Sequence, residues 1–314
     1  MTRIADWVAR HFTIELAAAG AKRKARVMRK IVVTGANKGI GKAIVQHALE
    51  FADDVFVYLG SRDTQRGHAA REDLLNRFPA AADRLELLTI DVASEDSVKA
   101  AAAACSGPLY ALVNNAGIGF GTASLSEVLA VNADGVRRAT DAFLQLLEPT
   151  NGRIVTVTSA SGPMFVAECD PDRQRFFTSP DTDWQTLHAF MRECEAHDTG
   201  AAFAARGMNS TNSYGLSKAC ANTYIQWLAG QHPNLKINAC TPGFIETDLT
   251  RPLADARGTT PAQMGMKSPE EATKAPLHLL FADLHGNGRY YGSDAVRSPL
   301  DRYRGPGDPP YTGT

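Results

Sequence analysis

The chain has 314 residues, of which 44% are hydrophobic and 21% charged, with a formal net charge of −1. This composition is ordinary for a globular protein with one large core or two smaller ones, and the near-neutral charge gives no reason to expect binding to nucleic acid or an anionic membrane. No apolar run reaches the ~18 residues of a membrane span, and the five cysteines lack CxxC spacing, so we expect reduced thiols, no metal site and no stable membrane insertion.

Residues 1–29 are basic, and Ile4, Trp7, Val8 and Phe12 are spaced as on one face of a helix. An amphipathic basic N-terminus is typical of a mitochondrial address or a surface anchor. Two acidic residues and the absence of serine argue against a transit peptide. We therefore expect a cytoplasmic protein whose extension is poorly ordered or packs as a helix on the main domain.

Between residues 30 and 295, short β-branched runs alternate with longer helical segments. Strands are expected within residues 30–35, 55–60, 84–91, 110–117, 152–161 and 235–243, with helices starting near Gly39, Arg66, Ser94, Leu125, Asn212 and Ser268. The runs are continuously apolar, as in strands covered on both faces. The pattern predicts an α/β fold: one domain with a doubly wound parallel sheet (a Rossmann fold), followed by a Pro/Gly-rich tail over 296–314.

The loop after the first run reads "TGANKGIG" and opens the first helix. Its glycines allow a tight turn and a close approach of the backbone to a pyrophosphate, and the helix N-terminus supplies N–H groups for it. The loop therefore predicts a dinucleotide site, with candidate contacts from Gly35, Asn37, Lys38, Gly39, Ile40 and Gly41.

The end of the second run indicates which cofactor is bound. An NAD site usually has a carboxylate there for the ribose 2′-hydroxyl, but this chain has Ser61 followed by Arg62, with Lys38 in the glycine loop. Two cations and a hydroxyl suit a 2′-phosphate, which favours NADP(H). Further contacts to the adenosine half are expected from the ends of the third and fourth runs, at Asp91, Val92, Asn114, Asn115, Ala116 and Gly117.

About fifty residues separate "TSASG" from "NSYGLSK", where a short loop would be usual. Within this insertion, at about 163–208, Asp181 or Asp183 can cap a helix. Its apolar stripe would comprise Trp184, Leu187, Phe190, Met191 and Cys194, and "DPDRQRFF" would form a shorter helix before it.

Four polar residues are candidates for chemistry. Tyr214 and Lys218 share one helix face at i, i+4, and a nearby ammonium lowers the pKa of a phenol toward a useful range. Ser159 follows the fifth run, at the sheet edge where ligands bind, and can donate a hydrogen bond to a carbonyl oxygen. Asn132 can anchor a water that links Lys218 to bulk solvent.

Taken together, "TGANKGIG", "NNAG", "VNADG", "TSAS", "YGLSK" and "TPGFIETDL" resemble the short-chain dehydrogenase/reductase family over nearly all of residues 30–290. The resemblance implies catalytic roles for Asn132, Ser159, Tyr214 and Lys218. It also implies cofactor contacts from Tyr214 and Lys218 and from the "PGFIET" stretch, at Pro242, Gly243, Ile245 and Thr247.

Within that family the chain resembles the monomeric NADPH-dependent carbonyl reductases, on "SRDTQRGHAA", "DPDRQRFF", "KSPEEAT" and the 55-residue separation of Ser159 from Tyr214. The resemblance implies that the inserted helix covers the surface through which other members pair, hence a monomer. No lysine follows "GIGF", which argues against recognition of glutathione-bearing substrates. Phe244 stands where that subgroup commonly has Trp.

The predicted function is NADPH-dependent reduction of a small-molecule carbonyl: an aldehyde, ketone or quinone. The substrate pocket is expected to be lined by Ser159, Met164, Phe165, Phe244 and Leu249. Two alternatives stay open at this point: an NADP-dependent alcohol dehydrogenase that oxidises a specific metabolite, and a non-catalytic NADP(H)-binding sensor.

Overall fold

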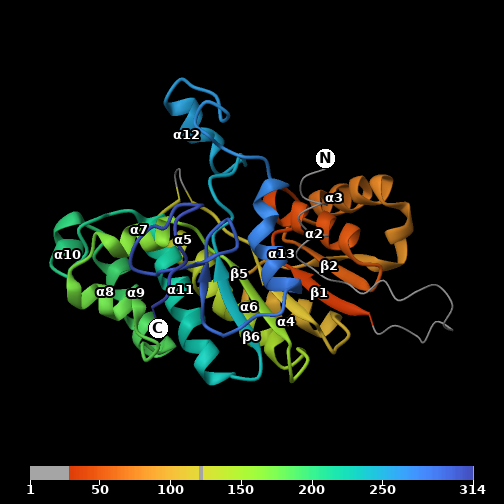
Figure 1. The fold of residues 1–314 in the computed structure, drawn as a ribbon, viewed down its shortest axis with the longest axis horizontal. Coiled ribbons are helices and arrows are strands. Elements are labelled where there is room, and N and C mark those ends of the chain that lie inside the picture. The colour runs from red at the N-terminus through yellow and green to blue at the C-terminus, as the bar shows by residue number, and fades with distance from the viewer. Residues whose placement is uncertain (1–27, 120–122, 314) are drawn as a thin grey trace.

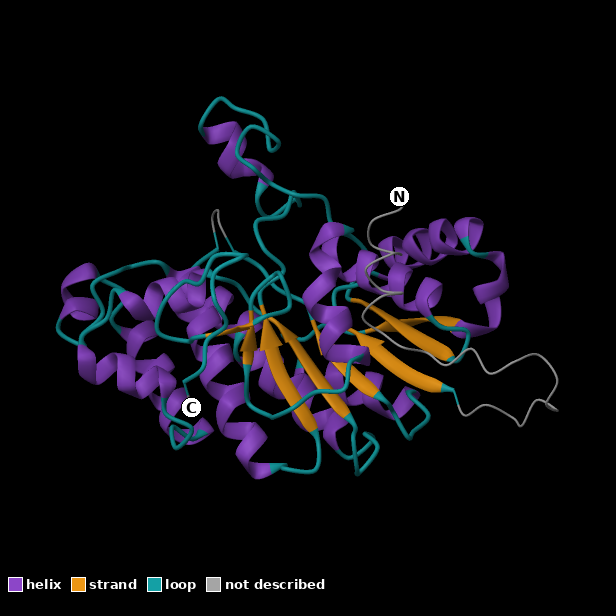
Figure 2. Ribbon diagram, in the orientation of Figure 1, coloured by secondary structure: helices purple, strands orange, loops and turns teal. Residues whose placement is uncertain are grey.

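The computed structural model describes residues 28–119 and 123–313 of the chain. They contain an eight-stranded sheet in the order β3-β2-β1-β4-β5-β6-β7-β8, parallel except for the antiparallel last strand (Figures 1 and 2). Its strands are β1 (Arg29–Val33), β2 (Val55–Ser61), β3 (Leu85–Thr89), β4 (Ala111–Asn114), β5 (Arg153–Val157), β6 (Lys236–Cys240), β7 (Tyr290–Tyr291) and β8 (Arg297–Ser298). The first six start within one residue of the predicted runs, most of them end earlier than predicted, and together they confirm the doubly wound fold; β7 and β8 were not predicted.

Most of the sheet is buried on both faces, which explains why its strands are largely apolar. In β1, Ile31 and Val33 belong to one hydrophobic cluster and Val32 to the other, because successive side chains point to opposite faces. Helices α2 (Gly39–Phe51), α3 (Thr64–Arg77) and α13 (Lys274–Phe281) supply the first cluster. Helices α4 (Glu95–Ala104), α5 (Leu125–Asn132), α6 (Asp134–Leu144) and α11 (Ser213–Gln231) supply the second. Short 3₁₀ turns, η1 (Pro79–Arg84) and η2 (Glu271–Thr273), complete these layers.

The insertion before α11 forms four helices beside the second layer (left in Figure 1): α7 (Ser161–Ala167), α8 (Pro171–Thr178), α9 (Trp184–Ala196) and α10 (Gly200–Ala204). The predicted helix is confirmed as α9, and Asp183 caps it by accepting from the Thr186 N–H at 2.7 Å. Its apolar stripe is buried against the main core. An ion pair of 2.9 Å between Arg192 and Asp134 joins α9 to the start of α6.

The C-terminal residues pack on the domain, which the sequence did not reveal. Strand β8 pairs with β7 at the edge of the sheet. Beyond it, the buried guanidinium of Arg304 forms an ion pair of 2.5 Å with Asp294 and donates to the carbonyls of Asp308 and Pro309. Residues 299–311 are thereby tied to the turn after β7.

One segment extends away from the body. Helix α12 (Arg251–Ala256) lies on an arm that projects beyond the carboxyl edge of the sheet (top of Figure 1). A bridge between Ile245 and Lys267 joins the two sides of this arm at its base. Among the described residues, no helix combines the length and apolarity needed to cross a bilayer. The predicted N-terminal extension lies outside the described residues, except for its last two positions.

Candidate functional site

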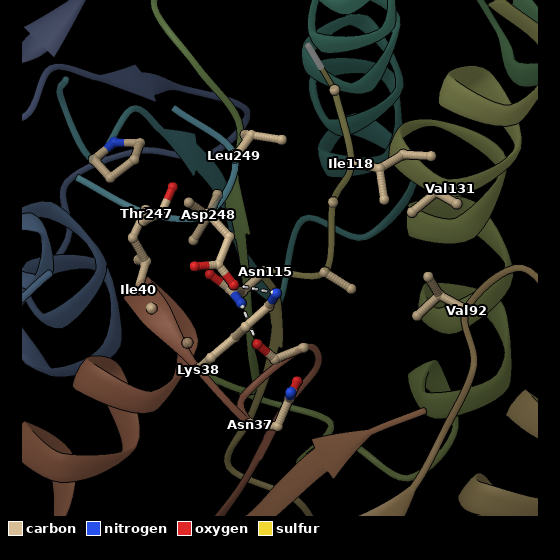
Figure 3. A pocket seen from close by; sticks show the side chains of 18 of the residues that line it. Asn37, Lys38, Ile40, Val92, Asn115, Ile118, Val131, Thr247, Asp248 and Leu249 are labelled. Atoms are coloured by element: carbon tan, nitrogen blue, oxygen red, sulfur yellow. Dashed lines mark hydrogen bonds and ion pairs between the residues drawn. The ribbon is translucent and has the colours of Figure 1, made fainter. Parts of the chain in front are cut away.

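A cavity of about 630 Å³ runs along the carboxyl edge of the sheet (Figure 3). Because the strands are parallel, the segments that follow β1 to β6 meet at this edge. All the predicted cofactor residues line the cavity except four: Ser61, Asn114, Gly243 and Ile245. The sequence did not predict other lining residues, among them Ile118, Gly119, Val131, Glu246, Asp248 and Arg251.

The glycine loop forms a cradle without room for side chains. A Cβ on Gly41 would meet the Asn115 amide and lie 2.5 Å from the Gly35 carbonyl oxygen, and one on Gly35 would lie 2.8 Å from the Ala116 Cα. Gly35 also has φ +64°, in the region that favours glycine. These contacts hold the loop flat against the segment after β4.

Two residues join the loops after β1 and β4. The Asn115 side-chain amide donates to the carbonyls of Thr34 (2.9 Å) and Gly35 (3.1 Å). In return, the Thr34 hydroxyl accepts from the backbone N–H groups of Asn115 and Ala116. Asn115 therefore shapes the cradle, and Thr34 is a supporting residue that the sequence reasoning did not single out.

The cradle fits the pyrophosphate of a dinucleotide. Helix α2 starts at Gly39 without a side-chain cap, so its first N–H groups face the cavity as donors for an anion. Arg62 follows β2 and lines the same cavity, at the place expected for a 2′-phosphate contact. Asp91 and Val92, after β3, line it as well.

Ser61 does not take the predicted part in cofactor selection. Its side chain is fully buried, and its hydroxyl donates to the Asp63 carbonyl at 2.7 Å. The hydroxyl thus shapes the turn into α3 and does not face the cavity. Lys38 does line the cavity, but its Nζ forms an ion pair of 2.6 Å with Asp248.

Gly243 and Ile245 are also displaced from the cavity wall. The chain turns at Gly243, where φ is +97° and a Cβ would lie 3.2 Å from that of Ser293. Ile245 is buried at the base of the arm. Their neighbours Pro242 and Thr247 line the cavity as predicted.

Tyr214 and Lys218 lie in the first turns of α11 and reach the other end of the cavity, only 8% and 5% exposed. Burial raises the pKa of the Tyr214 phenol to about 12, and a hydrogen bond with Ser159 acts in the opposite direction. Burial lowers the pKa of the Lys218 ammonium to about 8. Lys218 Nζ lies 5.5 Å from the centre of the Tyr214 ring. A phenol, a hydroxyl and an ammonium thus meet beside the cradle.

Asn132 joins the cavity wall to α11. Its side-chain amide donates to the Ile118 carbonyl (2.7 Å) and the Ser217 hydroxyl (3.0 Å), and its Oδ1 accepts from the Ile118 N–H (2.9 Å). These bonds use both amide hydrogens, so the side chain positions the cavity wall and α11, while a water held between Asn132 and Lys218 stays a prediction. Gly119 supports the same wall, because a Cβ there would overlap the Tyr214 ring.

The predicted substrate residues separate into four groups. Ser159 is not among the residues that line the cavity, but its side chain is hydrogen-bonded with Tyr214, which does line it. Leu249 lines the cavity. Met164 and Phe244 stand at the surface, 51% and 41% exposed. The prediction for Phe165 is wrong, because its side chain lies on the core side of α7 and packs edge-on against Phe177 with ring centres 6.0 Å apart.

Comparisons with known proteins show the family of the chain. Residues 29–169 match the family model described as short chain dehydrogenase. Carbonyl reductase [NADPH] 1 of Macaca fascicularis is 30% identical, covering 83% of this chain and 94% of the relative; the Homo sapiens protein of the same name is 32% identical, with 79% and 89% covered.

Solved structures share the fold. Salutaridine reductase from Papaver somniferum has a TM-score of 0.69 at 24% identity, covering 84% of this chain and 99% of its own. Menthone neomenthol reductase from Mentha piperita has a TM-score of 0.67 at 24% identity, covering 85% and 99%. The chain belongs to the short-chain dehydrogenase family.

Proposed function

We propose that this short-chain dehydrogenase is an NADPH-dependent carbonyl reductase in which Tyr214 donates the proton. The observation that carries the proposal is that Tyr214, which is hydrogen-bonded with Ser159, and Lys218 line one end of the cavity whose other end is the glycine cradle. The relatives named carbonyl reductase [NADPH] support the same cofactor and reaction.

The residues divide the work of carbonyl reduction. The bound reduced nicotinamide supplies a hydride to the carbonyl carbon. Ser159 donates a hydrogen bond to the carbonyl oxygen and holds it against the Tyr214 hydroxyl, which transfers its proton as charge develops on the oxygen. The hydrogen bond between Ser159 and Tyr214 supports this arrangement, since it brings the two hydroxyls to the same point.

Lys218 makes Tyr214 a better acid. Burial raises the pKa of the phenol to about 12, although the hydrogen bond with Ser159 lowers it, so the group releases its proton reluctantly. A positive charge beside the ring stabilises the phenolate that forms. With a pKa of about 8, Lys218 is mostly protonated at neutral pH and can provide that charge. Its position between Tyr214 and the cavity also suits hydrogen bonds to the ribose hydroxyls.

Selection of NADPH is assigned mainly to Arg62, with Lys38 as the second cation. Both line the adenosine end of the cavity. Leu249 adds an apolar side chain to the cavity lining, which favours aromatic ketones and quinones over sugars. Met164 and Phe244 would contact the part of a substrate that projects from the mouth.

The proposal includes a cytoplasmic monomer with a body over 30–295. Helices α8 and α9 pack against α11, and α9 also packs against α5, so the surface that the insertion covers is not open to a second copy. Light scattering of the full chain tests the monomer, and a stable dimer or tetramer would contradict it. Imaging of the fluorescently tagged full chain tests the location.

The central experiment compares Tyr214→Phe with Tyr224→Phe. Both tyrosines lie buried in α11, but the Tyr224 hydroxyl faces Asp141, away from the cavity. Loss of the proton donor should lower kcat by about 10² to 10⁴ while the Kd of NADPH stays within about twofold; Tyr224→Phe should retain turnover. A wild type that binds NADPH but reduces no carbonyl in a panel of aldehydes, ketones and quinones would refute the proposed function.

A further inference from the structure

An ion pair spans the cavity near its adenosine end. Lys38 belongs to the loop between β1 and α2, whereas Asp248 belongs to the segment after β6, yet Lys38 Nζ and Asp248 Oδ2 are 2.6 Å apart. Figure 3 shows the two side chains meeting above the glycine loop, with Thr247 and Leu249 on either side of Asp248. The pair therefore connects the cofactor cradle to the base of the projecting arm.

Arg251 also holds the Asp248 carboxylate in place. Its other oxygen accepts from Arg251 at 2.8 Å, and Arg251 is bound in turn by Glu246 at 3.1 Å. The hydrogen bond and charge of Lys38 hold the pKa of the Asp248 carboxyl below its usual value, with smaller contributions from Arg251 and Arg66. The group is thus a carboxylate at neutral pH, and Arg251 would keep a partner without it.

Most of the cations near Asp248 have a carboxylate partner. A smaller cavity beside the main one is lined by Lys38, Lys42, Arg66, Asp73 and Asp248, among others. Lys42 is paired with Asp73 at 2.7 Å, and Arg66 with Asp63 at 3.4 Å. Arg62 differs from these cations: within residues 28–119 and 123–313, it forms no ion pair with a carboxylate.

We infer that Asp248 is a specificity-determining residue: an internal counter-ion that occupies, on Lys38, the position a cofactor 2′-phosphate would take. A phosphate monoester carries more negative charge than a carboxylate at neutral pH, so the phosphate displaces Asp248 from Lys38. Binding of NADPH is weakened by the lost ion pair, whereas NADH has no phosphate and leaves the pair intact. Asp248 thus lowers the preference for NADPH over NADH. This inference rests on the proposed role of Lys38 at the 2′-phosphate.

The test is Asp248→Asn, with the Kd of NADPH and of NADH measured separately by quenching of tryptophan fluorescence without substrate. Because exposed ion pairs stabilise weakly, we expect the Kd of NADPH to fall about three- to fivefold and that of NADH to stay within about 1.5-fold. Asp255→Asn is the matched control: it makes the same charge change on the exposed arm and should alter neither value.

Repeating the substitution in a variant without Lys38 tests whether its effect depends on the ion pair. In Lys38→Ala, the further change Asp248→Asn should no longer strengthen NADPH binding, because the competition needs the ammonium. Three results would overturn the inference. The Kd of NADPH could rise in Asp248→Asn, the Kd values of NADPH and NADH could fall equally, or the Kd of NADPH could fall just as much in the Lys38→Ala background.

Different results would contradict the 2′-phosphate site and the role of Asp248. Arg62→Ala should raise the Kd of NADPH about tenfold and spare that of NADH. A wild type without preference for NADPH, or an Arg62→Ala variant that affects both cofactors equally, would contradict the 2′-phosphate site itself. A normal preference with an unresponsive Asp248→Asn variant would overturn only the role of Asp248.

Discussion

Replacing Lys218 with Met should stabilise the fold. The ammonium is buried, and its pKa falls from 10.5 in the unfolded chain to about 8. Since one pKa unit corresponds to 1.36 kcal/mol, keeping the protonated amine in this site costs about 3 kcal/mol at pH 7. Methionine has a similar unbranched length and no charge, so Lys218→Met should raise the free energy of unfolding by up to that amount while reduction of carbonyls is lost.

The gain has a defined pH dependence. Between pH 8 and 10.5 the unfolded chain binds more protons at this position than the folded protein, so the stability of the wild type rises with pH relative to the variant. The cost is present in full below pH 8 and disappears above 10.5. The advantage of Lys218→Met should therefore fall from about 3 kcal/mol at pH 7 to about 1.4 kcal/mol at pH 9.5.

Urea unfolding at the two pH values, followed by circular dichroism, measures this advantage. Lys99→Met serves as the control, because Lys99 is 67% exposed in α4 and its replacement should change stability by less than about 0.5 kcal/mol at either pH. A Lys218→Met variant that is less stable than the wild type, or whose advantage does not shrink at pH 9.5, would refute the reasoning from burial.

Three further predictions follow from single features. The kcat for carbonyl reduction should decline above pH about 8, where Lys218 loses its charge; a flat profile to pH 10 would contradict its role. Gly41→Ala should destabilise the fold by about 1 to 3 kcal/mol and weaken NADPH binding, whereas Gly230→Ala, where a Cβ meets nothing within 4 Å, should not; melting temperatures and Kd values compare them. Arg304→Met leaves the partly buried Asp294 without its cation and should cost up to about 3 kcal/mol, unlike Arg302→Met at an exposed position; equal urea midpoints would count against the role of the Arg304–Asp294 pair.

Local sequence patterns determined most of the framework. Continuous apolar runs separated by helical segments were enough to place β1 to β6, because strands covered on both faces are mostly apolar. Strands β7 and β8 have two residues each, too short for any periodicity. Helix α9 was predictable from its cap at Asp183 and its stripe, both of which are local signals.

The orientation of individual side chains was harder to predict from the sequence than the position of the strands and helices. Ser61 and Arg62 are neighbours at the end of β2. The Ser61 hydroxyl donates to the turn before α3, whereas the Arg62 side chain lines the cavity. Met164 and Phe165 are neighbours on one helix, and the face toward α11 buries Phe165. Sequence order places such pairs in the right region, but the packing of the adjacent element decides which of the two reaches the site.

The sequence by itself determined the fold class, the glycine cradle and the presence of Tyr214 and Lys218 on one helix face, since these depend on neighbours within a few residues. Only the tertiary structure decided that Lys38 meets Asp248, 210 positions away, and that Arg304 is buried on Asp294. Charged side chains on loops have no periodic signal, and many partners of opposite sign are available to each. The path of the backbone around the sheet brings one of them within hydrogen-bonding distance.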